Sequence, residues 1–177
     1  MKYTLYRYES ALSDLDPIYY QILALLQDDA RTTQMAIAEA VGLSQPAVAD
    51  RVRKLEERGA ITGYVARLDP RLLGNDIRAI VGVRIAHPRH HDAFIRKILE
   101  VAEVLECHRV AGLDSYILKV VTRNTATLDE LISDTLRRIP GVTRTHTTVV
   151  LSTVKEQTQI PLPAPSGGPR RRRKEAA

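Results

Sequence analysis

Apolar residues recur at helical spacing in the first third of the chain, where they predict three short helices. The first is expected over residues 15–29, with Asp16 as its N-cap and Pro17 in its first turn. Its apolar positions form one stripe, which is typical of a helix that packs against a core on one side only. They are Ile18, Ile22, Leu25 and Leu26.

The stretch from Arg31 to Gly63 predicts two further helices joined by a tight turn. Gly42 stands where the C-terminus of a helix favours a left-handed residue. Ser44 is expected to cap the next helix with its side-chain oxygen. The helix before the turn has its apolar residues at Met35, Ile37, Ala38 and Val41.

The helix after the turn has two faces of opposite character. One face is apolar and should pack inward, because it carries Val48, Val52 and Leu55 at i, i+4 and i+7. Gly59 should end the helix. The other face carries Pro46, Asp50, Arg53 and Lys54, with Gln45, Ala47 and Arg51 on its flanks. Two short helices joined by a glycine-containing turn, the second basic and presented outward, are the layout of a helix-turn-helix. A helical hairpin with a solvated charged face fits the same stretch and remains the alternative.

Strand-like composition begins after this motif. Residues 61–68 alternate roughly and predict a connecting strand or wing, which Asp69 and Pro70 stop. Residues 69–75 are expected to form a hinge. The pattern then predicts strands over 77–86, 104–110, 116–122 and 142–154, with helices over 91–101 and from Leu128 to Ile139. The second of these helices should be capped by Thr125 or Thr127 and stopped by Pro140 and Gly141.

This order of elements, βαββαβ, is the ferredoxin-like pattern. It places both helices on one face of a four-stranded antiparallel sheet. The other face then needs a cover, and a second copy of the chain is the usual one. The fold class is therefore α+β, and a homodimer would present two recognition helices to two DNA half-sites.

Composition narrows the possible classes of protein. A hydrophobic fraction of 44% over 177 residues is enough for one domain or two small ones. The net charge of +5 equals the charge of the run Arg170–Lys174, so it is weak evidence for nucleic acid binding. A single cysteine, Cys107, suits a reducing compartment. No apolar run suits a membrane span or a signal peptide, so a cytoplasmic protein without a membrane partner is expected.

Metal binding and catalysis find little support in the residues. His87, His90 and His91 cluster, and Cys107 precedes His108, but the spacings typical of zinc sites are missing. No nucleophile–base pair and no phosphate-binding glycine loop is apparent. We therefore expect no enzyme, no catalytic residues, no metal and no cofactor.

Several motifs in one order resemble the Lrp/AsnC (feast/famine) family of transcriptional regulators. The matching stretches are residues 15–16, 30–31, 41–44, 51–56, 59–64, 106–108, 112, 116 and 140–142. The resemblance covers residues 15–155. It implies a winged helix-turn-helix joined to a RAM-type ferredoxin-like domain that binds effectors and forms oligomers. It also implies dimers that assemble further to tetramers or octamers, double-stranded DNA as partner, and an amino acid or related metabolite as effector.

With this resemblance the chain divides into five parts. We expect an N-terminal arm over 1–14, a DNA-binding domain over 15–63, a linker strand and hinge over 64–75, an effector and oligomerisation domain over 76–155, and a disordered basic tail over 156–177. The tail could add nonspecific phosphate contacts or have no role. Such a regulator would be associated with the nucleoid.

The DNA-contacting residues are expected within a motif running from Gln34 to Arg53. They are Gln34, Ser44, Gln45, Pro46, Ala47, Asp50, Arg51, Arg53 and Lys54. By similarity the start of the second helix faces the groove, where Gln45 could pair with adenine and Ala47 could touch a thymine methyl group. Asp50 could accept from cytosine or orient its basic neighbours. For Arg51 an ion pair beside the core is the alternative to DNA contact.

The effector site is expected at the turn between the second and third strands, together with the last strand of a neighbouring chain. Its residues would be Gly112, Leu113, Asp114, Ser115, Tyr116, Thr147, Thr148 and Val149. The family commonly has an acid immediately before the tyrosine, whereas here Ser115 takes that place and Asp114 precedes it. From the residues alone, Gly-Leu-Asp-Ser is better explained as an ordinary turn between strands, and it is the resemblance that favours an effector site.

Three functions are consistent with the sequence. The first is an effector-responsive, sequence-specific transcriptional regulator. The second is an architectural DNA-binding protein without a small-molecule effector. The third is a small-molecule-binding or enzymatic domain whose helix-turn-helix makes only protein contacts.

Overall fold

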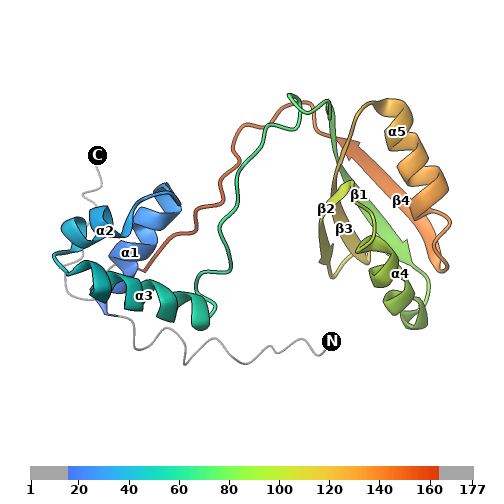
Figure 1. Ribbon diagram of the computed structural model, residues 1–177. Coiled ribbons are helices and arrows are strands. Elements are labelled where there is room, and N and C mark those ends of the chain that lie inside the picture. The colour runs from blue at the N-terminus through green and yellow to red at the C-terminus, as the bar shows by residue number, and fades with distance from the viewer. Residues whose placement is uncertain (1–15, 164–177) are drawn as a thin grey trace, which may run out of the picture. The chain divides into compact units, whose positions relative to one another are not determined.

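The computed structural model describes residues 16–163 (Figure 1). The described chain divides into two units, one formed by residues 16–66 with 157–163 and the other by residues 67–156. Each unit has a hydrophobic core of its own. The arm predicted over 1–14 and the arginine run of the tail lie outside the described residues.

The first unit contains the three helices that the apolar spacing predicts. They are α1 (Pro17–Asp28), α2 (Gln34–Val41) and α3 (Gln45–Glu57). Asp16 caps α1 as predicted, because its Oδ1 accepts hydrogen bonds from the backbone N–H groups of Ile18 and Tyr19 at 2.9 and 3.2 Å. Gly42 ends α2 in the left-handed region at φ 68°. The predicted left-handed glycine in the turn of the helix-turn-helix is therefore confirmed at Gly42.

The apolar faces of the three helices meet in one core. Its buried residues are Tyr19, Ile22, Ile37, Ala38, Val48, Val52 and Leu55. Met35 lies outside this core, and its side chain is 67% exposed. Two helical positions separate Met35 from the buried Ile37, and at about 100° per residue this turns Met35 to the opposite side of α2.

Two local predictions in this unit fail. Ser44 occupies the N-cap position of α3, but its side chain makes no capping hydrogen bond. Pro46 follows in the first turn and has no N–H to donate, which removes one of the two usual capping donors. Residues 61–68 form no strand, because no segment of the described chain pairs with them and alternation alone does not supply ladder partners.

The second unit is the predicted βαββαβ domain. Its strands are β1 (Ile77–Ile85), β2 (Val104–Arg109), β3 (Tyr116–Thr122) and β4 (Val142–Val149). Its helices are α4 (His91–Ile98), preceded by the 3₁₀ turn η1 (Pro88–His90), and α5 (Thr125–Glu130), which continues into the π-helical turn η2 (Leu131–Leu136). The sheet order is β2-β3-β1-β4 and all neighbours are antiparallel.

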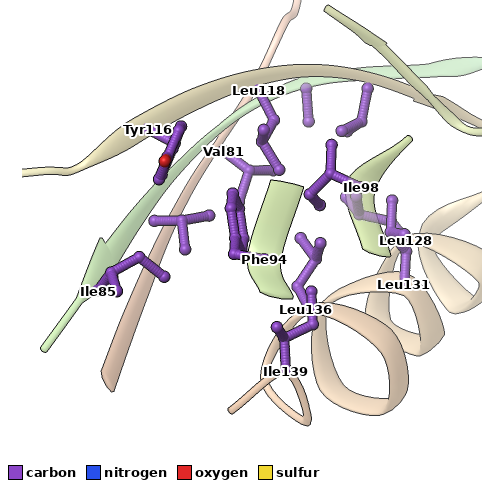
Figure 2. Packing of buried hydrophobic residues seen from close by; sticks show 13 residues of the cluster. Val81, Ile85, Phe94, Ile98, Tyr116, Leu118, Leu128, Leu131, Leu136 and Ile139 are labelled. Carbon is purple, nitrogen blue, oxygen red and sulfur yellow. The ribbon is translucent and has the colours of Figure 1, made fainter. Parts of the chain in front are cut away.

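The core of this unit lies between one face of the sheet and the helices (Figure 2). Val81 pairs with Leu118 across β1 and β3, so both side chains point to the helical side, where Phe94 of α4 and Leu136 of η2 meet them. All four are fully buried. The alternate residues of each strand therefore form the opposite face of the sheet, which we call the open face.

Three boundaries in this unit differ from the prediction. Asn124, not Thr125 or Thr127, caps α5: its Oδ1 accepts from the Thr127 N–H, and Thr127 Oγ1 accepts from the Asn124 N–H, which completes a capping box. α4 ends at Ile98, which leaves Leu99 81% exposed. β4 ends at Val149, the last residue in register with β1, and beyond it the Val150 N–H makes one further hydrogen bond to the Arg78 carbonyl at 2.9 Å. None of the described helices has the length and apolar character needed to cross a bilayer.

Candidate functional site

The first candidate site is the exposed start of α3. Ser44, Gln45 and Pro46 are exposed and Ala47 is half-buried, while Gln34 is exposed at the start of α2. A helix N-terminus offers backbone N–H groups and a positive dipole end, which suit a phosphate group. The side chains of Gln34 and of residues 44–47 are thus exposed or partly exposed to a ligand.

Arg51 lies apart from this accessible set. Its Nη1 donates to Oδ2 of Asp16 at 2.8 Å, and the guanidinium sits 4.5 Å from the ring centroid of Tyr19 on α1. The Arg51 side chain is only 22% exposed. These contacts support the alternative for Arg51, an ion pair that joins α3 to the N-terminus of α1.

Asp16 therefore caps one helix and pairs with another. Partial desolvation acts to raise the pKa of its carboxyl group. The hydrogen bond from Arg51, together with the backbone N–H of Tyr19, outweighs this effect and holds the pKa of Asp16 below its ordinary value. The carboxylate is thus the form that the folded unit favours.

Arg53 and Lys54 share one acidic partner on the exposed face of α3. Asp50 accepts from Arg53 Nη2 at 2.6 Å and from Lys54 Nζ at 2.7 Å, and Arg53 Nη1 also reaches Glu57 at 2.5 Å. The hydrogen bonds from Lys54 and Arg53 lower the pKa of Asp50. Exposed pairs of this kind contribute little to stability, so both cations remain free to exchange Asp50 for a phosphate group.

The second candidate site is the loop between β2 and β3. Ser115 fixes this loop to β1, because its Oγ accepts from the backbone N–H of Ile85 at 3.0 Å and its own N–H donates to the Val83 carbonyl at 2.8 Å. The Ser115 N–H bond continues the pairing of β1 with β3. Ser115 is thus an anchor of the loop.

The anchored loop places the Asp114 side chain over Gly82 on the open face. A Cβ atom at residue 82 would overlap the Asp114 carboxylate, so only glycine leaves room for it. Gly82 lies in the middle of the sheet, opposite Ile117 of β3 and His146 of β4. Gly82 was not predicted from the sequence, although a glycine inside a strand pattern is a known sign of close approach by another group.

The other predicted effector residues do not all gather here. Tyr116 is 2% exposed and lies on the helical side of the sheet, where its hydroxyl is 2.8 Å from Nδ1 of His91 and its ring packs at a tilt against Phe94. Register places Thr147 and Val149 on that same side and Thr148 on the open face. Gly112 and Leu113 are exposed in the loop. Asp114 and Thr148 are therefore the predicted side chains that share the open face.

A chain of ion pairs crosses one end of the open face. Lys119 of β3 bridges Glu156 at 2.9 Å and Glu106 of β2 at 3.1 Å, while Arg78 of β1 pairs with Glu156 at 2.9 Å. The hydrogen bonds that Lys119 donates to Glu156 and Glu106 raise the pKa of Lys119. His108 adds a contact to Glu106 at 3.1 Å. The open face thus has an ordered polar end beside the half-buried Ile80 and Ile117.

Two protein-family models match the chain. Residues 15–62 match a family described as winged helix-turn-helix DNA-binding, and residues 78–160 match the Lrp/AsnC ligand binding domain. The leucine-responsive regulatory protein of Escherichia coli K12 is 35% identical over 149 residues, which cover 83% of this chain and 91% of that protein. The same protein of Salmonella typhimurium is equally similar.

Solved structures of regulators share the fold. A transcriptional regulator of Neisseria meningitidis in complex with L-methionine superposes with a TM-score of 0.80 at 28% identity, over 83% of this chain and 96% of that one. A feast or famine regulatory protein of M. tuberculosis complexed with L-methionine gives 0.76 at 34% identity, over 84% and 98%. AsnC of E. coli gives 0.77 at 26% identity, over 82% and 97%.

Proposed function

Because the chain belongs to the Lrp/AsnC family of DNA-binding transcriptional regulators, which are not enzymes, we propose that an amino acid or related metabolite controls its DNA affinity or its assembly. Residues 15–63 would bind DNA, and residues 76–155 would bind the effector and form oligomers. Such a protein would act in the cytoplasm, on the nucleoid.

The start of α3 is proposed to enter the major groove. Gln45 would pair with adenine and Ala47 would contact a thymine methyl group. Arg53 and Lys54 would leave Asp50 and bind phosphates or guanine edges, because their present ion pairs are exposed and weak. Arg51 would keep its contact with Asp16 and hold α3 at the correct angle.

The observation that carries the effector proposal is the Asp114 carboxylate held over Gly82. A carboxylate in this place can accept hydrogen bonds from the ammonium group of an amino acid. The backbone N–H groups of the adjacent loop would hold the effector's carboxylate. Asp114 would then replace the acid that the family commonly has one position later, where Ser115 serves as loop anchor. The two relatives solved with L-methionine support an amino acid as ligand.

A dimer is proposed to form through the open face. Half-buried apolar residues and an ordered polar end give that face the mixed character of a protein interface. A second copy would bring its own β4 to the loop and complete the pocket, with Thr148 among the contacts. Dimers would assemble further to tetramers or octamers, and paired recognition helices would raise DNA affinity through effective concentration.

Thermal unfolding in the presence of each of the twenty amino acids tests this proposal. A ligand at about 100 times its Kd should add roughly 2.7 kcal/mol to the free energy of unfolding. We expect one amino acid to do so selectively, with the effect lost in Asp114→Asn and retained in Asp92→Asn, which makes the same change on α4. If no amino acid stabilises the protein, the architectural function without an effector becomes the better account.

A further inference from the structure

The chain returns to the DNA-binding unit after it has completed the sheet. Residues 157–163 belong to the same unit as α1, and Figure 1 draws them in red. The side-chain amide of Gln27, near the end of α1, holds both backbone groups of Ile160. Gln27 Oε1 accepts from the Ile160 N–H at 2.8 Å, and Gln27 Nε2 donates to the Ile160 carbonyl at 3.3 Å. The prediction of disorder over 156–177 is therefore wrong for this segment, which we call the clasp.

Further features favour a docked clasp. Gln159 Nε2 donates to the backbone carbonyl of Gln27 at 3.1 Å, which gives a third hydrogen bond at the same place. Leu162 is half-buried. Pro161 and Pro163 restrict the backbone on either side of Leu162, which reduces the conformational entropy lost on docking.

The clasp sets the point from which the C-terminal tail, with its arginine run, extends. Arg170 lies ten positions after Ile160 in the sequence, a span of up to about 33–36 Å when extended. Along α1, from Gln27 back to Asp16, the distance is only about 16 Å at 1.5 Å per residue. Asp16 contacts Arg51 in the middle of α3. The run Arg170–Arg173 is thus within reach of DNA bound at α3.

We propose that the clasp anchors the C-terminal tail on α1 and so delivers Arg170–Arg173 to the phosphates beside the site read by α3. An anchored tail acts at a high effective concentration, because its shorter free length confines the arginines near the DNA. Each phosphate that they neutralise would release counterions and steepen the salt dependence of binding. The arginines would add affinity for any duplex and no sequence preference.

Hydrogen exchange of the full-length protein tests the anchor without DNA or effector. In the docked clasp the Ile160 amide is protected by Gln27 Oε1. Gln27→Ala should speed its exchange by about twofold to tenfold, the range for one net hydrogen bond. Gln21→Ala, an exposed position on the same helix, should leave the exchange rate unchanged. Equal Ile160 exchange in the wild type and in Gln27→Ala would overturn the proposal.

A double-mutant cycle on duplex DNA of random sequence tests the delivery. Replacing Arg170–Arg173 by glutamine should make the slope of log K against log salt shallower by about 0.9 for each phosphate that the arginines neutralise in the wild type. Gln27→Ala should weaken binding by about twofold to tenfold in the wild-type chain, and should have no effect once the arginines are gone. Equal effects of Gln27→Ala with and without the arginines, or a glutamine variant with an unchanged slope, would refute the delivery of the tail.

Discussion

Arg51 and Asp16 are joined by a hydrogen bond of 2.8 Å that ties the middle of α3 to the N-cap of α1. The same carboxylate satisfies the backbone N–H groups of Ile18 and Tyr19, so one side chain organises two helices. The guanidinium also lies over the Tyr19 ring. Arg51 thus holds α3 against α1 and does not belong to the exposed face of α3.

Arg51→Ala should lower the stability of the DNA-binding unit by about 1 kcal/mol, from a partly exposed ion pair and a cation–π contact. Arg53→Ala should leave stability within about 0.5 kcal/mol of the wild type, because Arg53 is exposed, and should weaken DNA binding. Thermal unfolding and DNA titration of both variants separate the two roles. An Arg51→Ala variant that is as stable as the wild type but has lost DNA binding would contradict this account.

The stability contributed by Asp16 should depend on pH in the acid range. Its folded pKa lies below the ordinary value of 3.8, so the unfolded state binds the proton more readily. The contribution is therefore complete above pH 3.8 and is lost as the pH falls through the lower folded value. Unfolding by urea as a function of pH should show this loss in the wild type and a flatter acid limb in Asp16→Asn. Identical profiles would exclude the effect.

Asp50→Asn should strengthen nonspecific DNA binding. The substitution removes one negative charge from the exposed face of α3 and releases Arg53 and Lys54 from their shared partner. We expect affinity for random duplex to rise by about threefold to tenfold at low salt, with the salt slope steeper by about 0.9 for each additional phosphate neutralised. Asp28→Asn, which changes the same charge at the end of α1, is the control. A similar rise in affinity in both variants would point to net charge alone.

The helix-turn-helix and the βαββαβ order were predictable because their determinants are local. Asp16 and Gly42 act within a few residues of themselves, and the apolar spacing of α3 is read within one helix. The role of Arg51 depends on a partner 35 residues away, which no local pattern records. The clasp depends on a contact across 133 residues and on a side-chain amide with no periodic signature.

The candidate effector site was predicted only in part, because strand pairing decides which residues share a face of the sheet. Tyr116 follows the loop directly, yet alternation along β3 turns its side chain to the helical side. Gly82 comes from another strand and enters the site only because β1 lies beside β3. Neighbours in sequence and neighbours on one face of a sheet are different sets, and sheet pairing decides between them.

Gly82→Ala should weaken effector binding at little cost to folding. The new methyl group would occupy the space of the Asp114 carboxylate, which is the end of a mobile side chain and can rotate away. We expect the free energy of unfolding without ligand to fall by no more than about 1 kcal/mol. Effector affinity should fall by about tenfold to a hundredfold, the range for one charge-assisted hydrogen bond.

Combining Gly82→Ala with Asp114→Asn distinguishes this mechanism from general damage to the sheet. If the methyl group acts by displacing the carboxylate, the double variant should bind the effector no more weakly than either single variant, because both remove the same interaction. Isothermal titration with the amino acid identified by thermal unfolding supplies the affinities of the wild type and the three variants. Additive losses would show that Gly82 contributes by another route, and undiminished binding by Gly82→Ala would remove Asp114 from the effector site.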